Sequence, residues 1–487
     1  MFEDFKINVF LRVAACGSFT GAARELGVSQ PAISQNIAEI ERSVGAKLFD
    51  RNRGKVTLTD RGRAFLEHAE RISASYRAAG QTFVNPKSLL IKDVLHNGRI
   101  TNVLIKDGRF ADLHASAEAS AERVIDGEGL AILPALYNTH THAAMTLLRG
   151  YADDLPLDKW LQEYIWPYED KMTAADIAEG SRIAVREMID TGTVFFSDMY
   201  FEIQETIDVV KEEGIRAAIG ITVMDNHSKA VTEAKDKLVR EWVDPTGGAI
   251  QLVMAPHAIY TVGPENIKKR AAFARAHGLR IHMHAAETRG EVDDCVAAHG
   301  LTPIRYLDSL GLLGPDVILA HCVYVDEEEW GILAKRGVTV SHCPCSNMKL
   351  ASGRFPYELA IKSGVRITLG TDGASSNNNL DLREEMKFAA LLAKVNGDPT
   401  LLPAEEVFKW ATVNGAEAFG INAGEIAVGK DADALLVDLA DTRMAPCKTH
   451  GEGDSPEALY RNLISNFVYS ADSSCIRNVL CRGRVIK

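Results

Sequence analysis

Between residues 139 and 420, short apolar runs alternate with helical patterns, and this alternation leaves few folds open to the chain. Eight apolar runs have the length of strands, and their carboxyl ends are expected near His140, Met199, Val223, Pro256, His284, His321, His342 and Asp372. The segments between them include helical patterns at Ala175–Thr191, Glu202–Gly214, Lys229–Trp242, Pro264–His277 and Glu327–Arg336. Strands that alternate with helices predict a parallel sheet, and eight such units predict a (β/α)8 barrel of the α/β class.

Histidines gather at the predicted strand ends. Six of the fourteen lie at or next to one: His140, His142, His257, His284, His321 and His342. The active site of a (β/α)8 barrel lies at this face. His140 and His142 are separated by one residue, so both side chains point to the same side of a strand. With His284 and Asp372 they offer ligands from three strand ends, and such an open ligand set is typical of a catalytic zinc site.

A resemblance to a known family adds to this pattern. Residues 84–487 resemble the amidohydrolase superfamily, and within its aminohydrolases and chlorohydrolases they resemble the 5-methylthioadenosine/S-adenosylhomocysteine deaminases. The phrases that carry the resemblance are NTHTHAAMTLLRGYADDLPLDKWL (Asn138–Leu161), HMHAAET (His282–Thr288), AHC (Ala320–Cys322), SHCPCSNMKL (Ser341–Leu350) and LGTDGASSNNNLDL (Leu369–Leu382). The resemblance implies hydrolytic deamination of an adenosine-type nucleoside to the inosine analogue and ammonia. The substrates it implies are 5-methylthioadenosine, 5′-deoxyadenosine, adenosine or S-adenosylhomocysteine.

The same resemblance implies the metal. Its ligands correspond to His140, His142, His284 and Asp372. Other members of the superfamily place a modified lysine at the end of the fourth strand to bridge two metals, but here that strand ends in Met254–His257 without a lysine. We therefore expect one divalent metal, zinc, with iron, manganese and nickel as the alternatives. Such a metal lowers the pKa of a bound water toward neutrality.

Three residues are expected to act on the reacting atoms. Asp372 can take a proton from that water, and His321 can hold and polarise the attacking oxygen. Glu287, three residues beyond His284, can protonate the ring nitrogen, as a glutamate does in zinc nucleobase deaminases. The alternative for Glu287 is a solvated glutamate in the first turn of a helix. We expect His282 to be a buried residue and not a ligand.

The expected substrate contacts also come from the resemblance. Trp160 offers a stacking face, and Glu169 corresponds to the acceptor for the two ribose hydroxyls, with a charge at a helix start as its alternative. His257 corresponds to a residue that contacts purine or ribose, and Ser376 to a serine of the pocket wall. Family members that take S-adenosylhomocysteine hold its tail with arginines. Ala218–Val223, at the third strand end, has none, which favours a nucleoside without that tail.

Two other functions stay open. The barrel could sense a ligand for a transcription regulator without turning it over, although Glu287, His321 and Asp372 are all present. It could also be an aminohydrolase or chlorohydrolase that acts on a pterin, a guanine-like ring or a triazine. Glu169 argues against a substrate that is a bare ring, because such a ring has no ribose hydroxyls to donate hydrogen bonds to this carboxylate.

Alternating apolar patterns flank the barrel on both sides. After an expected joint at Val84–Ser88 they run to about residue 138, and they return over Gly424–Leu439 and Ile476–Lys487. Turn dipeptides break the first stretch, at Asn97-Gly98, Asp107-Gly108 and Asp126-Gly127. We expect a composite β-sandwich domain built from residues 88–138 and 421–487, with the catalytic barrel at 139–420.

Residues 1–83 predict helices and one short hairpin. Thr20 is expected to cap a helix over Gly21–Leu26, and Ser29 a helix that runs to about Val44 with Pro31 in its first turn. A turn at Arg51–Lys55 and a long helix at Asp60–Ala79 follow. Gly17–Gly62 resembles the all-α winged helix-turn-helix of LysR-type transcription regulators.

That resemblance implies contacts with double-stranded DNA. The start of the second motif helix would face base edges, through Gln30, Pro31, Ser34 and Gln35. The wing would meet phosphates, through Arg51, Arg53 and Lys55. Members of this family bind two DNA half-sites as a dimer, and the long helix forms the contact between the two subunits. The alternative is a helical cap that has lost DNA binding, since the regulators' usual ligand-sensing domain does not follow residue 83.

Charge and composition limit the remaining classes. The chain has 487 residues and a net charge of −12, of which residues 1–83 contribute +3 and the rest −15. With 46% hydrophobic and 25% charged residues it is globular, and no apolar run of about 18 residues predicts a membrane span. Ile7–Cys16 is interrupted by Arg12, so we expect no signal peptide. Eight cysteines without framework spacing favour reduced thiols in the cytoplasm. We expect a homo-oligomer, a dimer or tetramer.

Overall fold

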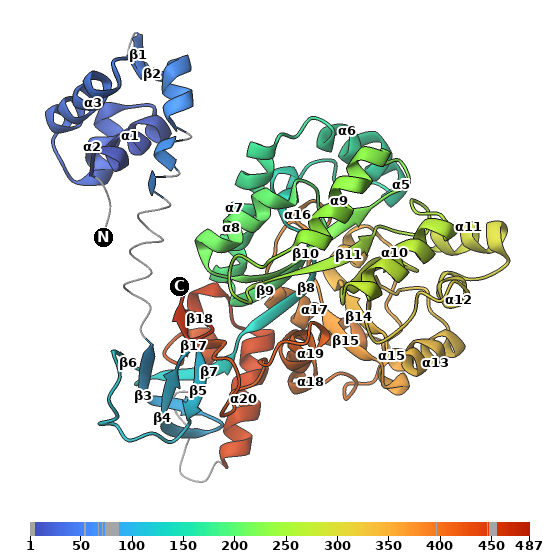
Figure 1. Ribbon diagram of the computed structural model, residues 1–487. Helices are drawn as coiled ribbons and strands as arrows, with labels where there is room; N and C mark the ends of the chain where they lie inside the picture. Colours follow the sequence, from blue (N-terminus) through green and yellow to red (C-terminus); the bar gives the residue numbers. More distant parts are fainter. Residues whose placement is uncertain are drawn as a thin grey trace. The chain divides into compact units, whose positions relative to one another are not determined.

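The computed structural model describes residues 5–52, 55–66, 68–70, 72–73, 87–395, 397–445, 447 and 455–487 (Figure 1). The chain divides into two compact units, residues 1–86 and residues 87–487. Within the described ranges, none of the helices has the length and apolar character that crossing a membrane requires.

The first unit is a small helical fold with a hairpin. Its elements are α1 (Phe5–Cys16), α2 (Phe19–Leu26), α3 (Gln30–Val44) and the antiparallel strands β1 (Phe49–Asn52) and β2 (Lys55–Leu58). Buried side chains that include Phe10, Ile33, Ile37 and Phe49 hold these elements together. Ser29 caps α3 as predicted. Residues 60–66, 68–70 and 72–73 are helical, and the predicted helix beyond 73 lies outside the described residues.

The predicted cap of the second helix was wrong. Ser18, not Thr20, is the N-cap: its hydroxyl accepts a hydrogen bond from Gly21 N at 3.1 Å, and α2 begins at Phe19. Ser18 has an extended backbone, which lets its side chain reach the free N–H groups of the first turn. Thr20 lies inside the helix, where it cannot serve as a cap.

The barrel of the second unit has eight parallel strands. They are β8 (Leu136–His142), β9 (Thr193–Asp198), β10 (Arg216–Val223), β11 (Ile250–Pro256), β12 (Arg280–Ala285), β13 (Val317–His321), β14 (Thr339–His342) and β15 (Arg366–Leu369). The last strand resumes as β16 (Asp372–Gly373), which pairs with β8 and so closes the sheet. The predicted (β/α)8 fold is confirmed, and every strand ends within three residues of its predicted end.

Helices surround the barrel (Figure 1). Those between the strands are α7 (Ala174–Asp190), α8 (Ile203–Glu213), α9 (Lys229–Glu241), α10 (Pro264–Ala276), α11 (Arg289–His299), α12 (Pro303–Ser309), α13 (Glu327–Arg336), α14 (Pro344–Lys349) and α15 (Tyr357–Ser363). After the last strand come α16 (Ala374–Asn377), α17 (Leu382–Lys394), α18 (Ala404–Ala411) and α19 (Val413–Ala418). The long connection after β8 has its own elements: η1 (Ala143–Leu148), α5 (Leu157–Lys159), the π-helix η2 (Trp160–Ile165) and α6 (Trp166–Glu169).

A second sheet combines both ends of this unit. Its strands are β3 (Ser88–His96), β4 (Arg99–Lys106), β5 (Arg109–Asp112), β6 (Arg123–Asp126), β7 (Leu130–Pro134), β17 (Ala434–Asp438), β18 (Ile476–Cys481) and β19 (Arg484–Val485). β7 pairs with β17, which joins the two stretches as predicted. Phe110 on β5 hydrogen-bonds through its backbone to Gly429 and Lys430 near β17, so the sheet curls around a shared core. The helix α20 (Pro456–Tyr469), between β17 and β18, was not predicted.

A buried ionic group joins this sheet to the barrel. Arg216, at the start of β10, forms ion pairs with Asp431 (2.9 Å) and Asp433. The Tyr137 hydroxyl also donates to Asp433. Arg216 is 4% exposed and Asp433 is 1% exposed, so the charges depend on each other for stabilisation.

Candidate active site

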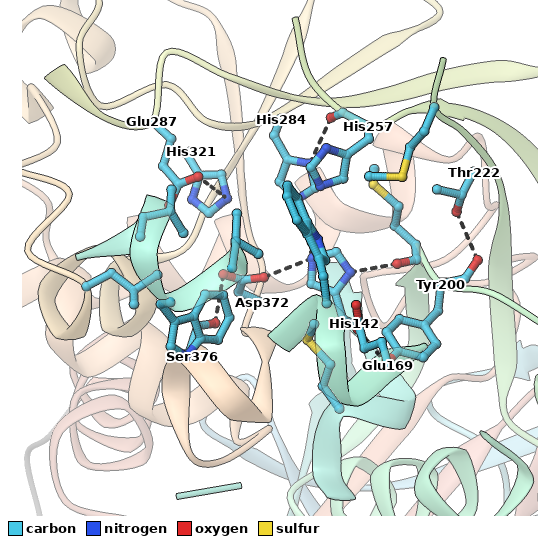
Figure 2. Close-up of a pocket in the computed structure, with 18 of the residues that line it drawn as sticks. His142, Glu169, Tyr200, Thr222, His257, His284, Glu287, His321, Asp372 and Ser376 are labelled. Atoms are coloured by element: carbon cyan, nitrogen blue, oxygen red, sulfur yellow. Dashed lines mark hydrogen bonds and ion pairs between the residues drawn. The ribbon is translucent and has the colours of Figure 1, made fainter. Parts of the chain in front are cut away.

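The strand ends bring the predicted ligands together. His140 and His142 come from the end of β8, His284 from β12 and Asp372 from β16. All lie at the carboxyl end of the barrel, where His142, His284 and Asp372 face a common pocket (Figure 2). Gly370 allows this approach, because a Cβ there would lie 2.7 Å from His140 Cβ.

The Nε2 atoms of three histidines point toward one carboxylate. His142 Nε2 lies 3.2 Å from Asp372 Oδ1, and His140 Nε2 lies 3.5 Å from the same oxygen. His284 Nε2 lies 3.3 Å from His142 Nε2. The His140 ring is fully buried, so water cannot reach its Nε2, and this atom has no hydrogen-bond partner within the described part of the protein. A metal ion among these atoms would satisfy it, so the donors fit one.

The other ring nitrogens have partners that fix the rings. His142 Nδ1 contacts the carbonyl of Met199 at 2.6 Å, and His284 Nδ1 contacts the carbonyl of His257 at 2.8 Å. Since a carbonyl only accepts, both Nδ1 atoms donate and the Nε2 lone pairs face the centre. His140 Nδ1 lies 3.1 Å from His282 Nε2. His282 is fully buried behind His140 and contacts Ser197 with its other nitrogen, as expected of a buried non-ligand.

The charge states of His140, His284 and Asp372 also suit a cation, whereas contacts with Asp372 outweigh burial and raise the pKa of His142 to about 9. Burial lowers the pKa of His140 to about 4 and lowers the pKa of His284 well below 6.5, which keeps both rings neutral. Burial alone would raise the pKa of Asp372, but its contacts with His140 and His142 keep it well below 3.8. A neutral imidazole and an ionised carboxylate are the forms that bind a metal. His140, His284, His321 and Asp372 also place one donor atom each within 4.8 Å of one another.

Glu287 faces His321 beside this cluster. Its Oε2 lies 3.7 Å from His321 Nε2, and its Oε1 accepts a hydrogen bond from Ser352 at 3.2 Å. Glu287 is only 5% exposed, so it is not the solvated glutamate of the alternative. Burial raises the pKa of its carboxyl above 4.5. Such a carboxyl retains its proton to higher pH, as a proton donor requires.

The opposite side of the pocket is formed largely by the connection after β8. Trp160, Glu169 and His257 line it, as does Tyr200. The Tyr200 hydroxyl donates to Glu169 Oε1 at 2.6 Å, and burial raises the pKa of Glu169 to about 7. Figure 2 shows Glu169 and Tyr200 across the pocket from Glu287 and His321.

Residues 131–486 match the family model described as the amidohydrolase family. This chain belongs to the amidohydrolase family. The 5′-deoxyadenosine deaminase of Methanothermobacter thermautotrophicus is 42% identical to this amidohydrolase over 410 residues, or 82% of this chain and 93% of that protein. The 5-methylthioadenosine/S-adenosylhomocysteine deaminase of Moorella thermoacetica is 44% identical over 371 residues, or 75% of this chain and 84% of that protein.

Solved structures agree on the amidohydrolase fold. A zinc-bound adenosine deaminase from Xanthomonas campestris is 34% identical, with a TM-score of 0.74 over 82% of this chain and 92% of that one. A guanine deaminase from C. acetobutylicum, at 21% identity and a TM-score of 0.72 over 83% of this chain and all of that one, supports the fold alone. Residues 6–63 match the model of the bacterial regulatory helix-turn-helix proteins of the lysR family. This match confirms the resemblance predicted for residues 1–83, which we refer to as the head.

Some residues of the amidohydrolase site were missed by sequence reasoning. Ser346 donates to Asp372 Oδ2 at 2.6 Å, and Asn347 Oδ1 lies 2.9 Å from His321 Nδ1. Ser376, expected in the pocket wall, lies there and also donates to Asp372 Oδ2 at 2.9 Å. Ser346 and Asn347 stand within the phrase SHCPCSNMKL, but nothing in the spacing of that phrase shows which partner each would meet.

In the helix-turn-helix unit, the start of α3 is open. Gln30, Pro31 and Gln35 are exposed and Ser34 is half-buried. Gln30 Nε2 donates to Ser34 at 2.8 Å, one turn further along the same face. Arg53 and the side chains of Arg51 and Lys55 lie outside what the structure describes, so the predicted wing contacts stay predictions.

Proposed function

We propose that residues 87–487 hydrolyse the amino group of an adenosine-type nucleoside and release ammonia. One observation carries the proposal: a single pocket has metal-type donors and Glu287 on one side and Glu169 on the other (Figure 2). The side with the metal-type donors and Glu287 suits hydrolysis of a C–N bond. The side with Glu169 suits hydrogen bonding to ribose hydroxyls. The names of the relatives, which are deaminases of 5′-deoxyadenosine and of 5-methylthioadenosine/S-adenosylhomocysteine, support the same activity.

The proposed metal is a single divalent ion, zinc, held by His140, His142, His284 and Asp372. The buried, unpartnered Nε2 of His140 and the carbonyl contacts behind His142 and His284 support this assignment. When bound, the metal supplies a water whose pKa is lowered toward neutrality. Asp372 then takes a proton from the attacking water, and His321 holds the incoming oxygen.

Glu287 completes the proposed proton path. It gives its proton to the ring nitrogen next to the carbon that is attacked, while the new C–O bond forms. The C–N bond then breaks, and the amine leaves as ammonia with the proton that Asp372 took. The proton of the added hydroxyl returns to Glu287 as the ring carbonyl forms. All atoms balance, and the acid and the base regain their starting states.

For the substrate we propose that Glu169 accepts the ribose hydroxyls, that Trp160 stacks on the base and that His257 and Ser376 line its pocket. The missing arginine at the end of β10 favours a nucleoside without an amino-acid tail. However, Lys235 on α9 donates to the carbonyl of Thr222 at 2.7 Å, so a cation reaches this strand end from a helix. Tailed and tailless nucleosides must therefore both be tested.

The test is ammonia release by zinc-loaded protein across a panel. The panel contains 5′-deoxyadenosine, 5-methylthioadenosine, adenosine, S-adenosylhomocysteine, adenine, guanine, a pterin and a triazine. Release from the adenosine-type nucleosides supports the proposal. Release of ammonia from the free rings alone would instead indicate an aminohydrolase that acts on free rings. Binding of nucleosides without any turnover would support the sensor alternative.

For the head we propose binding to double-stranded DNA. The observation in its favour is the open start of α3 within a unit that matches the lysR helix-turn-helix model. Since the rest of the chain carries −15, the +3 of the head must provide the attraction to phosphates, and binding should weaken steeply with salt. Electrophoretic retardation at low and high salt tests this. Failure to shift any DNA at low salt would favour a helical cap. A cytoplasmic location fits the eight unpaired cysteines and stays a proposal, as does the dimer or tetramer.

A further inference from the structure

The short segment that follows β14 contains three buried polar side chains that the packing of the fold does not by itself require. Ser346 and Asn347 lie in α14, and Ser352 lies just beyond it. They are 0%, 2% and 3% exposed, and yet each has its side chain turned toward the pocket side of the barrel and not into the apolar core. We refer to Pro344–Ser352 as the β14 segment.

Each of these side chains holds a different residue of the proposed chemistry. The Ser346 hydroxyl donates to Asp372 Oδ2 at 2.6 Å. Asn347 Oδ1 accepts from His321 Nδ1 at 2.9 Å, and Ser352 donates to Glu287 Oε1 at 3.2 Å. Asp372, His321 and Glu287 come from three different strand ends, and Figure 2 shows them along one side of the pocket.

We propose that the β14 segment is a positioning element that sets the orientation of all three groups at once. Ser346 and, from outside the segment, Ser376 both donate to Oδ2 of Asp372, which leaves Oδ1 to face His140 and His142. Asn347 holds the proton of His321 on Nδ1, so Nε2 faces Glu287. Ser352 occupies Oε1 of Glu287, which leaves Oε2 to face His321. This inference rests on the proposed deamination.

The segment has the anchors that such a role needs. Lys349 Nζ contacts Asp153 at 2.6 Å, the Ser375 carbonyl at 3.1 Å and Asn378 at 2.7 Å. Cys345 N donates to buried Glu385 at 3.0 Å, and Ser352 N donates to the Asn347 carbonyl at 2.9 Å. These contacts hold both ends of the segment, so its three polar side chains keep fixed distances from one another. Side chains locked in this way hold reactive groups more accurately than loops do.

The test compares Ser346→Ala, Asn347→Leu and Ser352→Ala in the full-length, zinc-loaded protein. Each is expected to lower kcat at least tenfold, with KM changed less than about threefold and with zinc content unchanged. Asn347→Asp keeps an acceptor oxygen for His321 Nδ1 but adds a buried charge, and it is expected to retain more activity than Asn347→Leu. Ser181→Ala is the matched control, because Ser181 is fully buried in α7 and its hydroxyl hydrogen-bonds with Thr206 and not with a residue of the proposed chemistry.

A double variant separates positioning from general damage. Ser352→Ala added to Glu287→Gln is expected to cause no further loss of kcat, since Ser352 acts only through Glu287. Losses that multiply in the double variant would overturn the proposal, as would wild-type kcat in all three single variants. Wild-type protein that releases no ammonia from any nucleoside would instead overturn the proposed function, so the two failures are distinguishable.

Discussion

At the scale of single residues, the environment of Glu287 carries the most chemical information. Burial raises the pKa of this carboxyl, His321 lies 3.7 Å from one oxygen, and Ser352 donates to the other. A buried carboxyl keeps its proton to higher pH than an exposed one. Glu287 is not among the proposed ligands, so its substitution separates proton transfer from metal binding.

We expect Glu287→Gln to lose a factor of about 10²–10⁴ in kcat, because a positioned proton donor contributes about that much. Zinc content, measured by elemental analysis, is expected to match wild type. Glu328→Gln is a suitable control, since Glu328 forms only a surface ion pair with Arg305. A wild-type kcat in Glu287→Gln would show that another residue donates the proton to the ring nitrogen.

A second prediction concerns Glu169 and pH. Burial raises its pKa to about 7, so the carboxyl is ionised above that pH and protonated below it. Because the ionised form is the proposed acceptor of the ribose hydroxyls, kcat/KM for nucleosides is expected to fall as pH drops below about 7. Glu169→Ala removes two hydrogen bonds worth about 1.5–3 kcal/mol each and is expected to leave any activity on adenine unchanged. Equal losses on nucleoside and base would make Glu169 structural.

At the scale of elements, the strand ends were predictable and the contacts between them were not. Apolar runs and helical periodicity located the end of every barrel strand within three residues, because buried parallel strands have a strong local signature. Ser346, Asn347, Ser352 and Tyr200 escaped prediction, since their partners are far away in the sequence and hydroxyl or amide side chains carry no spacing rule. The roles of the site residues and the domain limits at 83, 138 and 420 stay predictions.

Because the proposed ligands come from β8, β12 and β16, one metal would link three strands. We expect elemental analysis to find one tightly bound divalent ion per chain. Removing it with a chelator is expected to lower Tm, because a ligand that binds only the folded state stabilises that state. Two ions per active chain would contradict the single-metal site.

The buried ion pairs between the barrel and the second sheet allow a stability test far from the pocket. Asp433→Ala leaves the buried Arg216 guanidinium with Asp431 as its carboxylate partner, and losing one charged partner of such a group costs about 3–5 kcal/mol. Chemical unfolding measures this loss. Asp308→Ala, which breaks the more exposed pair with Arg336, is expected to cost much less than Asp433→Ala and serves as the control.

At the scale of the whole molecule, two units with different charge share one chain. All residues assigned to catalysis lie at or beyond His140, and residues 1–86 form a unit with its own core. Deletion of residues 1–83 is therefore expected to leave kcat/KM within about twofold while abolishing any DNA retardation. Loss of catalysis from a folded, truncated protein would show that the head contributes to the assembly of the enzyme.

The two-residue strand β16 links the order of synthesis to the appearance of activity. Asp372 pairs with Thr141 and Gly373 pairs with His142, so barrel closure joins positions 231 residues apart. A ribosome that has released residues 136–342 has delivered all the histidines of the site but not the carboxylate that lies between them. Closing so long a stretch of chain costs conformational entropy and comes late. A nascent chain therefore gains its barrel and its reactive centre in the same step.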